Sequence, residues 1–161
     1  MPNPRGPESA GVSAVLAVVL ATIGFFALAV FGLGALSVAT DRDIIAVPGL
    51  GQVPGVVGMV VAVVAFALTL AGTLRARRPS FVSTIVIALM PTLLHLATVW
   101  VAVLSAAGSY VVATAVAGDL VRGGASAVIL LAAAIAGWSG IALRRTRAEH
   151  PRWPWERDED E

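Results

Sequence analysis

Four long apolar stretches decide what this chain can fold into. They cover residues 10–36, 54–74, 81–105 and 124–143, and the charged residues lie between them rather than within them. An α-helix needs about 20 apolar residues to cross the roughly 30 Å hydrocarbon core of a bilayer, and each stretch meets that length. The sequence therefore predicts an all-α membrane protein with four transmembrane helices in an antiparallel bundle.

The composition agrees with a lipid environment. Hydrophobic residues make up 58% of the 161 residues and charged residues 13%, whereas soluble domains carry roughly 25% charged residues. The first stretch is far longer than the core of a cleaved signal peptide, about 7–15 residues, so we expect it to persist as a first span. The absence of cysteine excludes disulfides and thiolate metal sites. A net charge of +1 gives no reason to expect nucleic-acid binding.

The arginines predict the direction in which the helices cross. All basic residues are arginine: one in the N-terminal tail, three between the second and third spans, five in the C-terminal tail, and one in each remaining connection. Cytoplasmic loops carry the excess of positive charge, so both termini are expected in the cytoplasm. We expect a cytoplasmic N-terminal tail at 1–9, a transmembrane domain at 10–143, a cytoplasmic C-terminal tail at 144–161, and a multi-pass location in the cell membrane.

The segment between the third and fourth spans is too short to cross a membrane. Residues 106–123 are apolar for about twelve positions and then reach Asp119 and Arg122; runs of that length indicate interfacial, re-entrant or buried helices. We expect a short exoplasmic helix that leans on the bundle, with Asp119 and Arg122 paired on one face because they are three residues apart. The alternative is that the fourth helix begins near Tyr110 and projects past the membrane.

Small and hydroxylated residues indicate which face of each span lies against its neighbours, because helices in lipid associate through close packing and hydrogen bonds. In the third span, small, hydroxylated, proline and histidine residues repeat along one face: Thr84, Ala88, Pro91, His95, Thr98, Ala102 and Ser105. We expect this seam to face the bundle. Stripes of small residues in the other spans favour tight packing: Ala14, Ala17, Ala21 and Gly24; Gly55, Gly58 and Ala62; Ala132, Ala136 and Gly140.

His95 is the one ionisable residue within the four predicted spans. Pro91, one turn earlier, leaves the carbonyl of Ile87 without its helical donor. Freed carbonyls in spans are satisfied by neighbouring helices, hydroxyls or water, and Thr92 and Thr98 carry suitable hydroxyls. Pro91, Thr92, His95 and Thr98 therefore form a candidate intramembrane polar site.

No acid, base or second histidine accompanies His95 at its depth. A histidine–carboxylate proton relay lacks its second member, and a metal site needs three or four ligands. The sequence therefore predicts no cofactor, no metal and no catalytic residue. The favoured interpretation is a neutral, hydrogen-bonded packing histidine; the alternatives are a gate on a permeation path and a ligand shared between symmetry-related chains.

The C-terminal tail, "RRTRAEHPRWPWERDEDE", combines a basic stub, two tryptophans and an acidic end. Arginines beside the last span are attracted to anionic headgroups by about 1 kcal/mol each. The tail is then either a stop-transfer signal with a solvated end or a short docking peptide in which Trp153 and Trp155 anchor a partner.

The arginine turn "RARRPS", the four short spans and the closing "PRWPWERDEDE" resemble small four-span membrane proteins of actinobacteria that have no assigned function. The resemblance covers the whole length and rests on the layout and the tail. It implies an integral membrane protein of the cell membrane and carries over no catalytic residue.

Good packing seams beside very little buried polar chemistry predict a protein that is not an enzyme. We expect an accessory, scaffold or interaction subunit whose partners are the lipid bilayer and either further copies of itself or another membrane protein. The alternative is an oligomeric small channel or transporter with a path near His95, because transport folds place broken helix segments at mid-membrane and Pro91 supplies one break. The substrate or partner and the oligomeric state stay open at this point.

Overall fold

The computed structural model describes residues 13–42, 44, 49–75 and 82–145. Within these ranges the chain forms five helices: α1 (Ala14–Thr40), α2 (Val53–Arg75), α3 (Ser83–Ala107), α4 (Tyr110–Arg122) and α5 (Ala125–Arg145). All except α4 are long and apolar enough to cross a membrane. The described part is thus all-helical, and the chain is a multi-pass membrane protein.

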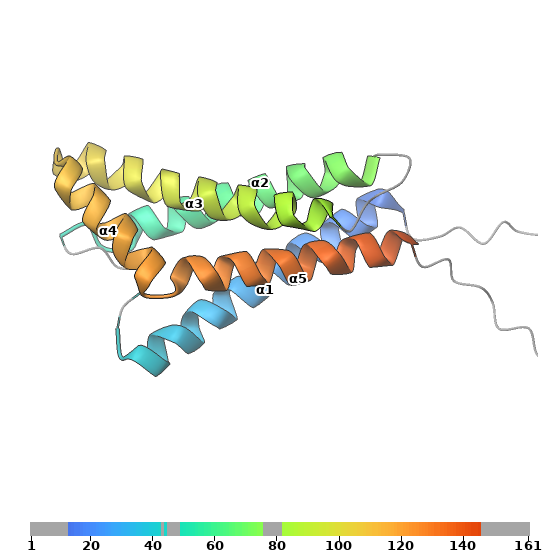
Figure 1. The fold of residues 1–161 in the computed structure, drawn as a ribbon, viewed down its shortest axis with the longest axis horizontal. Helices are drawn as coiled ribbons and strands as arrows, with labels where there is room; N and C mark the ends of the chain where they lie inside the picture. Colours follow the sequence, from blue (N-terminus) through green and yellow to red (C-terminus); the bar gives the residue numbers. More distant parts are fainter. Residues whose placement is uncertain (1–12, 43, 45–48, 76–81, 146–161) are drawn as a thin grey trace, which may run out of the picture.

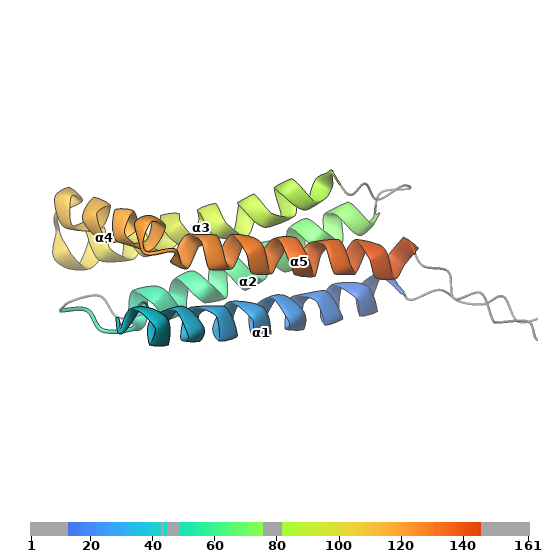
Figure 2. The same cartoon turned by 60° about the horizontal axis from the view of Figure 1, so that its bottom comes forward.

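The four long helices lie side by side, and successive ones run in opposite directions (Figures 1 and 2). α3 packs against α2 and α5, and α1 packs against α5 and α2. The start of α1 and the end of α5 lie at the end of the molecule opposite α4 (Figure 1). α4 lies against α3 and leads into α5, and the chain enters and leaves the described structure at the opposite end.

α1 begins and ends at residues that satisfy its free backbone groups. The hydroxyl of Ser13 accepts a hydrogen bond from the backbone N–H of Leu16 at 3.1 Å, which is the usual role of an N-cap serine. At the other end Asp41 adopts a left-handed conformation with a φ of 51°. The helix reaches Thr40, four residues past the predicted span, because no glycine or proline interrupts residues 37–40.

The short helix predicted before the last span is present as α4. Gly108, with a φ of 63°, ends α3, and the hydroxyl of Ser109 accepts from the backbone N–H of Val112 to cap α4. Gly124, with a φ of 88°, separates α4 from α5. The alternative of one helix that begins near Tyr110 and continues into the last span is therefore wrong.

The larger apolar cluster fills the space between the four long helices. Phe25 of α1 stacks on Phe66 of α2, with ring centroids 4.6 Å apart and planes 19° apart, and both side chains are fully buried. Gly140 of α5 lets three helices meet, because a Cβ there would lie 3.0 Å from the Cβ of Ala21 and 3.1 Å from Cδ2 of Leu70. Most residues of the predicted stripes are thus buried at helix contacts. Gly24 is an exception, because a Cβ there would meet no atom within 4 Å.

A smaller apolar cluster joins α3 to α4. Its buried members are Val99 and Val103 of α3 and Ala113 of α4. Beside it, the indole Nε1 of Trp100 donates a hydrogen bond to Oγ1 of Thr114 at 3.3 Å. α4 is thereby held against the last turns of α3.

Candidate functional site

The buried face of α3 follows the predicted seam only in its first half. Ala88, Pro91 and His95 are buried as expected. Beyond His95 the prediction is wrong: Thr98 and Ala102 are only half-buried, Ser105 is exposed, and the buried residues are Val99 and Val103. In this half of the helix, Val99 faces Gly58 of α2, and Val99 and Val103 form an apolar cluster with Ala113 of α4.

His95 packs directly against the backbone of α2 at Gly58. The histidine is 6% exposed. A Cβ at Gly58 would lie 3.0 Å from Cδ2 and 3.2 Å from Nε2 of His95, and 2.8 Å from Cγ2 of Val99. Glycine at position 58 is therefore what lets the imidazole fit between α2 and α3. Both residues belong to the small and polar positions predicted to face the bundle, but their pairing is not evident from the sequence because they lie on different spans.

The hydroxyls near Pro91 do not compensate the carbonyl that the proline releases. Oγ1 of Thr92 donates to the carbonyl of Ala88 at 2.8 Å, and Oγ1 of Thr98 donates to that of Leu94 at 2.7 Å. Both are bonds to the residue four positions earlier, which hydroxyls within helices commonly make. The expectation that these threonines would satisfy the carbonyl of Ile87 is wrong.

The four residues of the candidate polar site do not converge on one point. Pro91 and His95 lie on the buried face of α3, and Thr92 is half-buried beside them. Thr98 instead lines a shallow groove on the outside of α2 and α3, together with Val57, Ala97, Val101 and Ala102. Within the described residues the ring of His95 makes no hydrogen bond to another side chain or backbone group.

Three buried hydroxyl groups have no hydrogen-bond partner within the described part of the chain: that of Thr84, which belongs to the predicted seam, and those of Thr22 and Ser126. Thr84 lies in the first turn of α3 and Ser126 in the first turn of α5. Because these helices run in opposite directions (Figure 1), the two hydroxyls lie at opposite ends of the molecule. They do not form one site.

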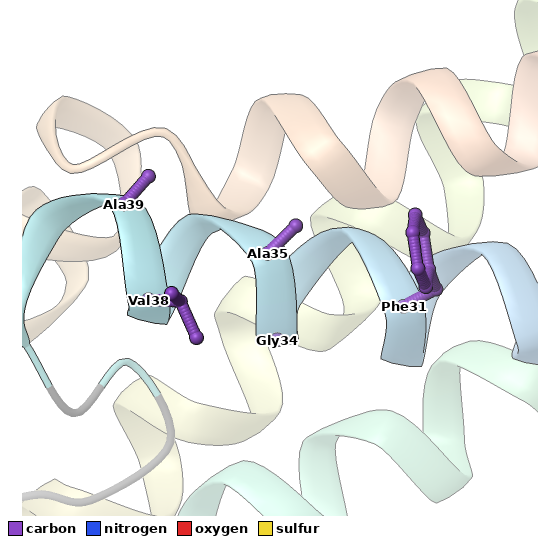
Figure 3. Close-up of a pocket in the computed structure, with 5 residues that line it drawn as sticks. All are labelled: Phe31, Gly34, Ala35, Val38 and Ala39. Atoms are coloured by element: carbon purple, nitrogen blue, oxygen red, sulfur yellow. The ribbon is translucent and has the colours of Figure 1, made fainter.

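A second shallow hollow lies on the last turns of α1 (Figure 3). Its lining is entirely apolar: Phe31, Gly34, Ala35, Val38 and Ala39. It offers no nucleophile, acid, base or metal ligand. Across the ranges that the structure describes, no three His, Cys, Asp or Glu side chains gather where they could hold a metal ion.

Asp119 and Arg122 pair at the end of α4, as their spacing predicted. Nη2 of Arg122 lies 3.1 Å from Oδ1 of Asp119, and both side chains are largely exposed. Exposed pairs of this kind contribute little to stability because water and salt screen them. The tail residues Trp153 and Trp155 lie outside the described residues, so the docking-peptide hypothesis stays a prediction.

A family model described as "Family of unknown function (DUF6121)" matches residues 8–161. The chain belongs to this family. The match takes in all five helices and the C-terminal tail. An uncharacterised family was what the resemblance implied. No curated protein and no solved structure matches the chain.

Proposed function

We propose that this protein is a non-catalytic accessory or interaction subunit of a membrane complex. The observation that supports it is the character of the interior. Among the described residues, His95 is the one polar residue that is buried as a whole; the other unpartnered buried polar groups are the hydroxyls of Thr22, Thr84 and Ser126. Acid–base or nucleophilic catalysis needs at least two positioned groups, and the neighbours of His95 at Gly58 and Val99 supply none. The proposal includes no enzymatic activity and no cofactor.

In this proposal the four long helices form an antiparallel transmembrane bundle in the cell membrane of an actinobacterium. The two tails and the α2–α3 connection together hold nine arginines and the remaining connections two. This supports cytoplasmic termini, because cytoplasmic loops are enriched in positive charge. α4 is then exoplasmic. The interior serves packing, and the surface carries the partner contacts.

Purification tests the proposal directly. A chain tagged at its C-terminus and expressed at its chromosomal level is expected to co-purify with a second membrane protein in fixed proportion after mild solubilisation. The tagged partner should retrieve this chain in return, and an unrelated tagged four-span protein should retrieve neither. A chain that always isolates alone and still transports a solute would contradict the proposal.

The alternative function is a small channel built from several copies, with a path near His95. Pro91 and His95 on the inner face of α3 are the observation in its favour. The close approach of the ring to Gly58 supports it less, because the backbone of α2 occupies the space on that side of the imidazole.

Vesicle flux separates the two functions. In the accessory proposal, vesicles that contain the purified protein conduct no more solute than empty vesicles between pH 5 and pH 8, and His95→Ala changes nothing. His95→Asn, which keeps a polar side chain at this position, serves as the control. A flux that varies over this pH range and disappears in His95→Ala would establish the channel instead.

A further inference from the structure

We draw no further inference here: the strongest candidate, the shallow groove on the outside of α2 and α3 lined by Val57, Ala97, Thr98, Val101 and Ala102, is an apolar face whose one side-chain hydroxyl, that of Thr98, already donates to the carbonyl of Leu94, and nothing in the structure shows what covers it.

Discussion

Replacing Phe25 by alanine is expected to lower the free energy of unfolding by about 3 kcal/mol, at the lower end of the range for buried phenylalanines. The ring is fully buried and stacks on Phe66 with centroids 4.6 Å apart, so its removal leaves a cavity between α1 and α2. We expect a value at the lower end of this range because, when the protein unfolds within a membrane, the ring becomes exposed to lipid rather than to water. The substitution then costs only the lost packing and no hydrophobic transfer free energy. Reversible unfolding in mixed detergent micelles measures the change.

The matched control lies on the same helix. Phe31 is 77% exposed, so Phe31→Ala removes the same atoms without opening an internal cavity and should change the free energy of unfolding by less than about 0.5 kcal/mol. Equal losses for Phe25→Ala and Phe31→Ala would mean that α1 does not pack through the Phe25–Phe66 stack.

Replacing Gly58 by leucine is expected to cost about 3 kcal/mol, the upper part of the range for overpacking a filled interior. Already the Cβ would lie 2.8 Å from Cγ2 of Val99 and 3.0 Å from Cδ2 of His95, so α2 and α3 must separate. Because α4 packs on Val99, the separation should also disturb α4. Loss of the hydrogen bond from Trp100 would show as a changed tryptophan fluorescence.

The same substitution at Gly72 is the control, since a Cβ there meets no atom within 4 Å. Gly72→Leu should be neutral or stabilise by up to about 1 kcal/mol, because leucine is a better helix former than glycine. Gly58→Ala should be partly rescued by Val99→Ala, which removes the nearest obstructing atom. If Gly58→Leu proves as harmless as Gly72→Leu, the close contact of α2 with α3 at Gly58 is wrong.

The candidate site shows where prediction from the sequence succeeded and where it stopped. Burial of Pro91 and His95 followed from the spacing of small and polar residues along one helix. The prediction that Thr92 or Thr98 satisfies the carbonyl released by Pro91 was wrong. A threonine hydroxyl in a helix readily donates to the backbone carbonyl four residues earlier in the same helix, and both residues do so. The contact of His95 with Gly58 could not be predicted, since nothing in either helix alone specifies which turn of the other lies beside it.

The sequence by itself determined the number of spans, their approximate positions, the separate short helix and the Asp119–Arg122 pair. These depend on hydrophobic length, on glycine conformation and on neighbours three residues apart, all of which act within one short segment. Only the tertiary structure decided that α4 covers Val99 and Val103 and that Phe25 meets Phe66. Those features depend on the register between helices, which is set by the shapes of facing side chains. The periodicity of a single helix does not reveal that register.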